Sequence, residues 1–181
     1  HGNTEVHGEW LTYVKRDLSS PRAIVRKSLK TGIEEHIADC WGQCNHQWNH
    51  KGDVLYFMHS PAKDGFQQYE TLYTYHSETK KIEHLNVHGR IRRFCVDEND
   101  DLYRIVQDGD NTEIWKFNGA SDELIYRSEP FEQIEDIVVK SGNIISVIFN
   151  PKKQQADLYQ YQNGEWIAIT DSKSTELAPF W

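Results

Sequence analysis

Cysteine and histidine side chains, which are common metal ligands, gather in one stretch of this sequence. Cys40, Cys44, His46, His50 and His59 all fall within it. Thiolate and imidazole groups are the usual ligands of Zn²⁺. If the chain from Cys44 to His50 is extended, Cys44, His46 and His50 point to one face, because side chains alternate along a strand. The stretch therefore has the chemistry for a metal site.

The length of that stretch argues against a simple site. Residues in a row on one strand span too great a distance to meet at one tetrahedral ion. Binding would need a bend in the chain, or help from His36 or another part of the fold. The ordinary alternative is that these side chains are neutral members of a core. We expect no cofactor, and keep a divalent metal at Cys44, His46 and His50 as the alternative.

Other catalytic chemistry has no motif in the chain. A Gly-x-Ser-x-Gly nucleophile elbow is absent, and so are Gly-x-Gly-x-x-Gly and Gly-x-x-x-x-Gly-Lys phosphate loops. The acidic stretch 97–101 lacks the correctly spaced Gly and Glu of a calcium loop, so we interpret it as a solvated hairpin turn. A protein without enzymatic activity is the favoured interpretation.

Composition bounds the class of protein. The 181 residues are 12% aromatic, which is too much for a disordered chain. The net charge of -8 disfavours nucleic acid as a partner, because affinity for phosphates comes from Lys and Arg. No apolar run approaches the roughly 20 residues that span a bilayer, so membrane insertion is not expected. The composition predicts one globular domain with a core of its own.

The three cysteines do not resemble a disulfide framework, because an odd number cannot all pair. We expect Cys40, Cys44 and Cys95 to be small buried residues. A local bridge between Cys40 and Cys44 is open if the compartment is oxidising. The compartment stays undecided, with an extracellular or cell-surface location favoured.

A unit of alternating strands and polar turns recurs along the chain. Leu29, Tyr75, Phe117 and Tyr161 end equivalent strands, and they are 46, 42 and 44 residues apart. Gly, Pro, Asn and Asp fall between the strands, and no window has a helical stripe. The expected strands are 10–14, 24–29, 34–38, 44–48, 54–58, 71–75, 81–85, 90–96, 102–106, 114–117, 123–126, 133–139, 144–149, 158–161, 165–169 and 177–181.

Four short antiparallel strands every 40 to 45 residues are typical of a propeller blade. A single sheet cannot bury both of its faces, so blades stack and their aromatic side chains fill the gaps. The sequence predicts an all-β fold, a β-propeller of four four-stranded antiparallel blades, and a sandwich is the competing fold. The repeats are approximately 7–43, 44–88, 89–131 and 132–176, in a single domain of residues 1–181, with a closing strand at 177–181.

Residues 48–57 (WNHKGDVLYF) resemble the W-S-P-D-G-K-x-I-x-F repeat of TolB-like and prolyl-oligopeptidase-type propellers, in the broad WD40-like class. His50 departs from that repeat, and the third and fourth repeats keep only short Asn-Asp and Ser-Gly turns at the equivalent place. The resemblance covers essentially the whole chain. It implies the propeller architecture and leaves the activity open, because propellers host many functions.

The two ends of the chain suggest how a ring would close. No inner strand is evident before Trp10, whereas Trp181 stands 44 residues after Ile137, at the place of an inner strand. We expect strand 177–181 to pair as the innermost strand of the first blade, which would remove two exposed sheet edges. The alternatives are four blades of a larger ring, or a unit completed by oligomerisation.

Two sets of residues are expected to bind a partner. The first lies on the inner strands, which line the axis of a propeller, where mixed charges either hold a small polar ligand or solvate a channel. The second is the loop residue Trp41, which suits an exposed contact or a cap on the core. The inner-strand residues are His46, Arg92, Arg93, Glu135, Asp136 and Glu176.

We therefore expect a non-enzymatic recognition or scaffold module that binds a protein or carbohydrate partner through its loops or axial face. The alternative is a small propeller enzyme acting on glycans, a lyase or hydrolase, made metal-dependent by His46 and His50. A third hypothesis is a subdomain that shields or positions a larger protein.

Overall fold

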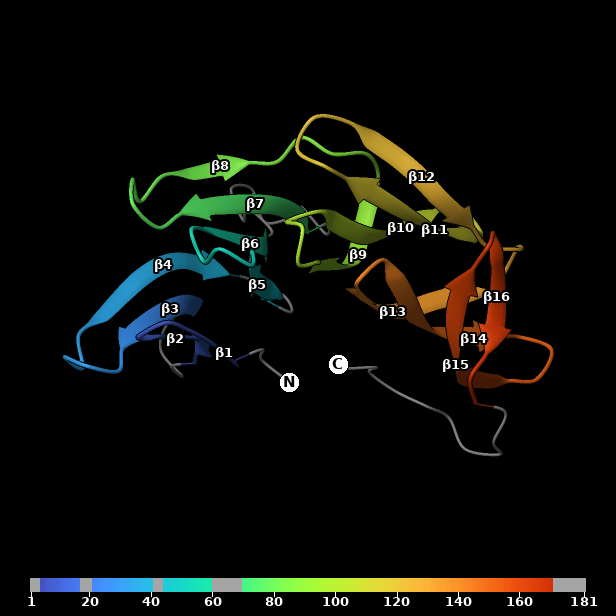
Figure 1. Ribbon diagram of the computed structural model, residues 1–181, viewed down its shortest axis with the longest axis horizontal. Coiled ribbons are helices and arrows are strands. Elements are labelled where there is room, and N and C mark those ends of the chain that lie inside the picture. The colour runs from blue at the N-terminus through green and yellow to red at the C-terminus, as the bar shows by residue number, and fades with distance from the viewer. Residues whose placement is uncertain (1–3, 17–20, 41–43, 60–69, 171–181) are drawn as a thin grey trace. The chain divides into compact units, whose positions relative to one another are not determined.

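β-Strands make up the regular secondary structure of the computed structural model (Figure 1). The structure describes residues 4–16, 21–40, 44–59 and 70–170. Within those ranges there is no helix, and sixteen strands form four four-stranded antiparallel sheets. Strands that follow one another in sequence are neighbours in each sheet, as in a propeller blade. The predicted fold class, an all-β propeller of four blades, is confirmed.

The chain divides into two compact units, residues 1–87 and 88–181. The first unit holds two sheets. The first sheet contains β1 (Thr4–His7), β2 (Trp10–Lys15), β3 (Arg22–Ser28) and β4 (Glu34–Cys40). The second contains β5 (His46–Trp48), β6 (Val54–His59), β7 (Thr71–His76) and β8 (Ile82–His84).

The second unit also holds two sheets, the third and fourth of the chain. The third sheet contains β9 (Arg90–Val96), β10 (Leu102–Asp108), β11 (Asn111–Phe117) and β12 (Asp122–Arg127). The fourth contains β13 (Gln133–Lys140), β14 (Asn143–Asn150), β15 (Gln155–Gln162) and β16 (Glu165–Ala168).

The first strand of the first blade is the main difference from the sequence prediction. We expected no inner strand before Trp10, and this was wrong, because β1 pairs with β2 through Gly8 at a positive φ of 58°. The strand is four residues long and has one aliphatic side chain, Val6, so its periodic signal is weak. The innermost place of this blade is therefore filled by β1. The predicted closing strand 177–181 lies outside the described residues.

Each unit has an apolar core between its two sheets. In the first unit Ile24 and Ala38 of one sheet pack with Leu55, Phe57 and other residues of the second. In the second unit Ile105 and Ile114 pack with residues of the fourth sheet. Sheets that cannot bury both faces alone are thus stabilised by stacking in pairs.

Polar side chains organise the turns of the blades. Asn49 Oδ1 accepts hydrogen bonds from the backbone N–H groups of Asp53 and Val54, each at 3.1 Å, in the turn between β5 and β6. Asp97 Oδ1 accepts from the N–H groups of Asn99 and Asp101, each at 2.9 Å. The acidic stretch 97–101 therefore forms the hairpin turn between β9 and β10, as expected.

Three β-bulges matter for the candidate sites. The pairing registers leave Ile37 of β4, Arg92 of β9 and Glu135 of β13 as extra residues opposite continuous partner strands. A bulge bends its strand and redirects the side chains around it. Arg92 and Glu135 occupy the first strands of successive blades, 43 residues apart.

Candidate functional site

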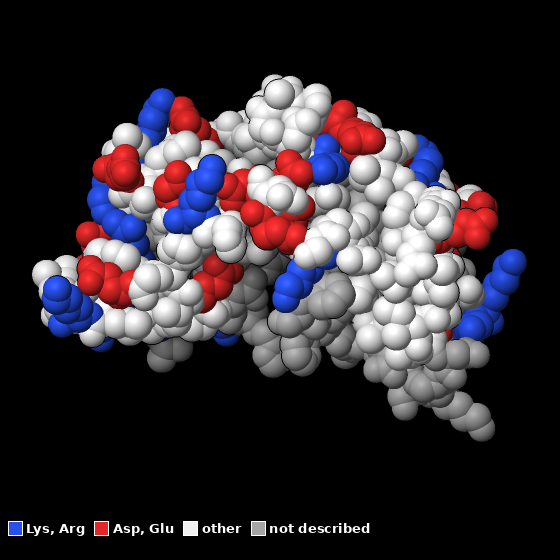
Figure 2. Space-filling view, in the orientation of Figure 1, with Lys and Arg blue, Asp and Glu red and all other residues white. Residues whose placement is uncertain are grey.

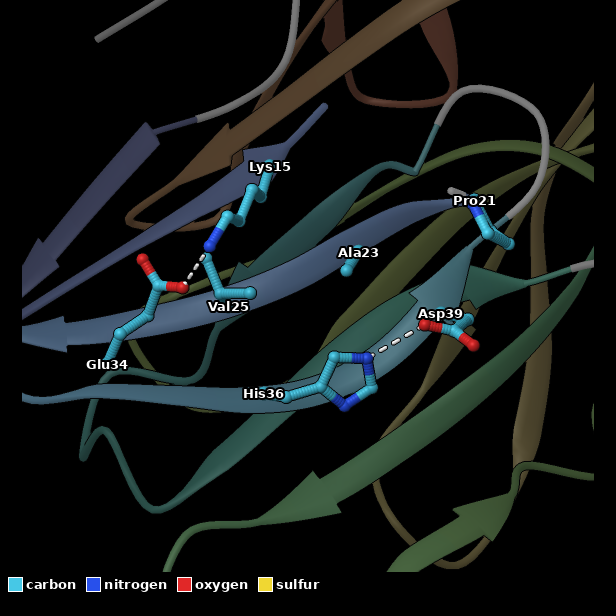
Figure 3. Close-up of a pocket in the computed structure, with 7 residues that line it drawn as sticks. All are labelled: Lys15, Pro21, Ala23, Val25, Glu34, His36 and Asp39. Carbon is cyan, nitrogen blue, oxygen red and sulfur yellow. Dashed lines mark hydrogen bonds and ion pairs between the residues drawn. The ribbon is translucent and has the colours of Figure 1, made fainter. Parts of the chain in front are cut away.

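A cavity of about 440 Å³ lies on one face of the first sheet (Figure 3). It is formed by the end of β2, by β3 and by β4, together with the residue that precedes β3. Its lining combines small apolar side chains with charged ones. The lining residues are Lys15, Pro21, Ala23, Val25, Glu34, His36 and Asp39.

The bulge at Ile37 builds this face. Val25 pairs with His36, and Ala23 pairs with Asp39, so both pairs of neighbours belong to one face of the sheet. In a regular strand, His36 and Asp39 would point to opposite faces because they are three residues apart. The extra residue between them brings both side chains into the cavity.

Two polar pairs flank the floor of the cavity. Lys15 Nζ lies 2.5 Å from Glu34 Oε1, and Tyr13 donates its hydroxyl hydrogen bond to Glu34 Oε2 at 2.6 Å. The hydrogen bonds from Lys15 and then Tyr13 lower the pKa of Glu34, because both stabilise its charged carboxylate form. On the other side, His36 Nε2 lies 2.8 Å from Asp39 Oδ1 (Figure 3).

The floor between these pairs is apolar. Ala23 and Val25 lie between the two polar pairs in Figure 3, and Val25 is 2% exposed. The side chains of His36 and Asp39 are 57% and 60% exposed, so they can meet a ligand. The seven lining residues include no Ser, Thr or Cys nucleophile. The arrangement is therefore suited to holding a ligand with an apolar group between polar ends.

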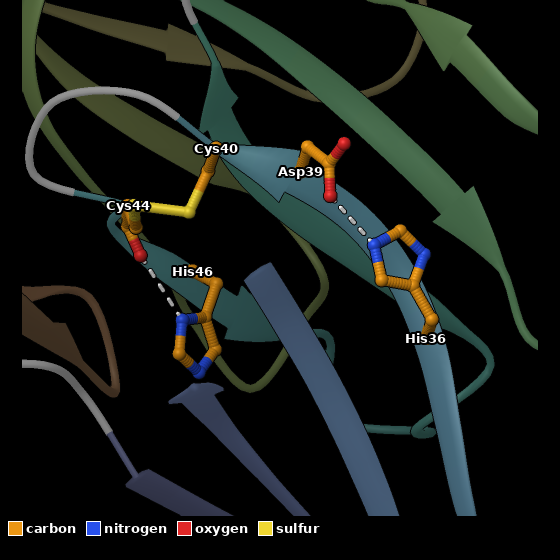
Figure 4. The surroundings of a disulfide bond; sticks show 5 residues. All are labelled: His36, Asp39, Cys40, Cys44 and His46. Carbon is orange, nitrogen blue, oxygen red and sulfur yellow. Dashed lines mark hydrogen bonds and ion pairs between the residues drawn. A yellow bond between two sulfur atoms is a disulfide. The ribbon is translucent and has the colours of Figure 1, made fainter. Parts of the chain in front are cut away.

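The Cys40–Cys44 disulfide joins β4 to the residues just before β5 (Figure 4). Both half-cystines are fully buried, and Cys44 has a positive φ of 57°. The carbonyl oxygen of Cys44 lies 3.1 Å from His46 Nδ1 (Figure 4). The bridge is the local one that the sequence left open, and Cys95 is a buried free thiol.

The geometry around His46 differs from the extended run considered for a metal. β5 begins at His46, and the left-handed Cys44 precedes it, so the condition set for a one-face metal site, an extended chain from Cys44 to His50, is not met. His46 is fully buried, and burial lowers its pKa. Hydrogen bonds to the backbone of Cys44 and Thr12 raise the pKa, but by less than burial lowers it. His50 is exposed in the following turn.

These positions do not form a metal centre in the described part of the chain. The disulfide engages the sulfur of Cys44, which leaves no thiolate there while the bond is intact. Within residues 4–16, 21–40, 44–59 and 70–170, no three His, Cys, Asp or Glu side chains lie together in a way that could hold an ion. A metal-dependent enzyme stays a prediction, which elemental analysis of the purified chain tests.

The inner-strand candidates of the second unit come together. Arg92 and Arg93 lie on β9, Glu135 and Asp136 lie on β13, and these two strands are neighbours. Burial raises the pKa of Asp136, and this effect exceeds the lowering by the Ile137 N–H group and by the positive charge of Arg93. Trp41 and Glu176 lie outside the described residues.

Sequence reasoning missed most of the cavity. Lys15 stands on β2, whereas Glu34 and Asp39 stand on β4, and no sequence motif links them. His36 was considered only as a helper for a metal. The decisive feature, the bulge at Ile37, follows from the pairing of β3 with β4 and has no Gly or Pro to mark it.

No protein-family model and no curated protein matches the sequence. Solved structures do match the fold. The β-propeller domain of the Trilobed protease from Pyrococcus furiosus has a TM-score of 0.64 and 18% identity, over 94% of this chain and 58% of that one. TolB from Acinetobacter baumannii has a TM-score of 0.66 and 16% identity, over 88% of this chain and 40% of that one.

The structure of a peptidase also matches the fold of this chain. The acylaminoacyl peptidase of Pyrococcus horikoshii has a TM-score of 0.64 and 15% identity, over 93% of this chain and 32% of that one. The chain thus spans between 32% and 58% of the length of these three proteins. The resemblance to TolB-like and prolyl-oligopeptidase-type propellers is confirmed for the fold. Among the described residues, no helix is long and apolar enough to cross a membrane.

Proposed function

We propose that this chain is a non-enzymatic recognition module that binds a protein partner, and that the cavity of the first sheet receives an extended segment of that partner. The observation that carries the proposal is the apolar floor of Ala23 and Val25 between two polar pairs. Buried apolar contact supplies affinity in such sites, and a few fixed polar groups supply orientation.

The place of the cavity in the sheet supports a polypeptide ligand. β4, which contributes Glu34, His36 and Asp39, is the last strand in the order of the first sheet. The backbone groups at a sheet edge pair readily with an extended segment, whose alternate side chains then enter neighbouring pockets. None of the seven lining residues is Trp, Tyr or Phe, whose rings are the usual stacking partners of sugars.

The charge distribution supports a protein rather than a polyanion. On the face shown in Figure 2, basic and acidic side chains are interspersed. A phosphate backbone calls for a continuous basic surface, whereas protein interfaces use mixed charges to fix register. The Trilobed protease, whose propeller domain shares this fold, supports a role as one domain of a larger protein.

Peptide selection tests this function. A library of random dodecapeptides is selected on the wild-type chain, with counter-selection on Ala23→Arg, whose long charged side chain fills the floor of the cavity. We expect enriched peptides that lose binding on Ala23→Arg and weaken about tenfold on Asp39→Ala, the loss of one charge-assisted contact. Lys152→Gln, an exposed change in the second unit, is the matched control and should leave binding unchanged.

Two results of this selection would contradict the function proposed for the cavity. If no peptide is enriched over the Ala23→Arg counter-target, or if the enriched peptides bind Ala23→Arg as tightly as the wild type, the cavity does not recognise a protein segment. Circular dichroism of each variant checks that the β-sheet content is retained.

A further inference from the structure

We propose that Arg92, on the bulge of β9, is a binding site for a carboxylate group of a peptide ligand. This site belongs to the second unit and goes beyond the function proposed for the cavity of the first sheet. Three features of the second unit support it: the bulge, the hydrogen bonds that hold the guanidinium, and the lack of an acidic partner among the described residues.

The bulge sets Arg92 apart from its neighbours on β9. Ile91 pairs with Val106, and Arg93 pairs with Ile105, so Arg92 has no partner of its own on β10. Its side chain is part-buried. Since a bulge redirects the extra residue out of the regular alternation, Arg92 is placed by the backbone rather than by core packing.

Two neutral amides hold the guanidinium. Arg92 Nη1 donates to Gln107 Oε1 at 3.1 Å and to Gln133 Oε1 at 3.4 Å. Gln107 is itself fixed, because its Nε2 donates to the carbonyls of Gly109 at 2.8 Å and Asn111 at 2.9 Å. These contacts orient Arg92 and leave its charge uncompensated.

Several other arginines among the described residues have acidic partners. Arg26 pairs with Glu35 at 2.8 Å, and Arg104 pairs with Asp122 at 2.7 Å. For Arg92, no carboxylate of residues 4–16, 21–40, 44–59 and 70–170 lies within 4.0 Å. Its Nε–H and Nη2–H₂ donors form the flat fork that matches a carboxylate in a bidentate pair.

The surroundings favour a carboxylate over a phosphate. Glu135 and Asp136 lie on the neighbouring strand β13. A dianionic phosphate would be repelled by these acidic groups more strongly than a singly charged carboxylate. Phosphate sites also draw on several cations or on a row of backbone N–H groups, whereas the fork of a single Arg suffices for a carboxylate.

Nuclear magnetic resonance of the full chain tests this site. The probe is acetyl-Gly-Glu-Gly-amide, compared with acetyl-Gly-Gln-Gly-amide and with inorganic phosphate. The readout is the Nε–H resonance of Arg92 in ¹⁵N-labelled protein, assigned by its disappearance in Arg92→Lys. We expect a saturable shift with the Glu peptide, binding at least tenfold weaker with the Gln peptide, and weaker binding of phosphate than of the Glu peptide.

Variants separate the fork from charge alone. Backbone amide shifts report peptide binding in each variant and also show that the fold is kept. Arg92→Gln should abolish binding of the Glu peptide, and Arg92→Lys, which keeps the charge without the fork, should weaken it about tenfold. Lys152→Gln, which removes one positive charge elsewhere in the second unit, should bind as the wild type does.

The proposal is overturned by any of four results. These are the absence of a saturable shift with the Glu peptide, equal affinity for the Gln peptide, tighter binding of phosphate, or unchanged binding by Arg92→Lys. The probe peptide is not one selected on the first sheet, and the variants change residues of the second unit. This outcome is therefore independent of the peptide selection on the cavity of the first sheet.

Discussion

Replacement of Glu5 by Gln should stabilise the folded chain at neutral and alkaline pH. Glu5 lies on β1, and its Oε2 accepts a hydrogen bond from the backbone N–H of Trp48 at 2.9 Å. Burial raises the pKa of Glu5 from its ordinary value of 4.5 to about 7, although the Trp48 hydrogen bond lowers it. The folded state therefore holds this proton more tightly than the unfolded chain.

The sign of the effect follows from proton linkage. Below about pH 4.5 Glu5 is protonated in both the folded and the unfolded state, so its ionisation does not change the free energy of unfolding. Between about pH 4.5 and pH 7 the unfolded chain releases the proton while the folded chain keeps it, so the free energy of unfolding falls. Above pH 7 the loss is complete, and the distance between the two pKa values corresponds to at most about 3 kcal/mol.

Glu5→Gln keeps an oxygen to accept the Trp48 hydrogen bond and removes the ionisation. In urea unfolding followed by tryptophan fluorescence, we expect the variant to match the wild type at pH 4 and to gain up to about 3 kcal/mol at pH 8. Glu9→Gln, an exposed change in the turn that follows β1, is the matched control. A gain that is the same at pH 4 and pH 8, or that Glu9→Gln reproduces, would refute the reasoning.

Three further substitutions test the packing. Replacing both Cys40 and Cys44 by Ser should lower the free energy of unfolding by about 2 kcal/mol, because the bridge closes a five-residue loop and so lowers the entropy of the unfolded chain. If the free energy of unfolding does not fall under oxidising conditions, that result would contradict a formed bridge. Asp122→Ala should cost about 3 kcal/mol in urea unfolding because it leaves the fully buried Arg104 without its carboxylate, and a change below 1 kcal/mol would show that Arg104 is solvated. Gly89→Ala should cost about 2 kcal/mol or more, because φ is 81° and the new Cβ would lie 2.2 Å from a side-chain carbon of β10; an unchanged melting temperature would disprove that contact.

Most of the fold was predictable because its signals are local. Each strand expected between Trp10 and Ile169 overlaps an observed strand, since apolar and polar residues alternate and turn residues separate the runs. In β6, for example, Leu55 and Phe57 enter the core while Val54 and Tyr56 are partly exposed. β1 escaped prediction because a strand of four residues contains too few positions to define a period.

The candidate sites were harder to predict because they depend on register. His36 and Asp39 share a face only through the bulge at Ile37, and a bulge arises from pairing with another strand. Arg92 and Glu135 were expected on inner strands, and they lie there. That each is the extra residue of a bulge, and that amides rather than carboxylates hold Arg92, required the structure.

The disulfide was also only partly predictable from the sequence. The spacing of Cys40 and Cys44 allowed a local bridge, while the left-handed backbone of Cys44 that accompanies it has no sequence signal. The bridge in turn removed the thiolate on which the metal alternative partly depended.

The most direct test of the proposed recognition function is a map of where a selected peptide binds. Backbone amide shifts of the ¹⁵N-labelled chain are recorded as the peptide is added. We expect the largest changes on β3 and β4, at Ala23, Val25, His36 and Asp39, with saturation at one peptide per chain. Changes confined to other sheets, or spread evenly without saturation, would contradict a binding site on the first sheet.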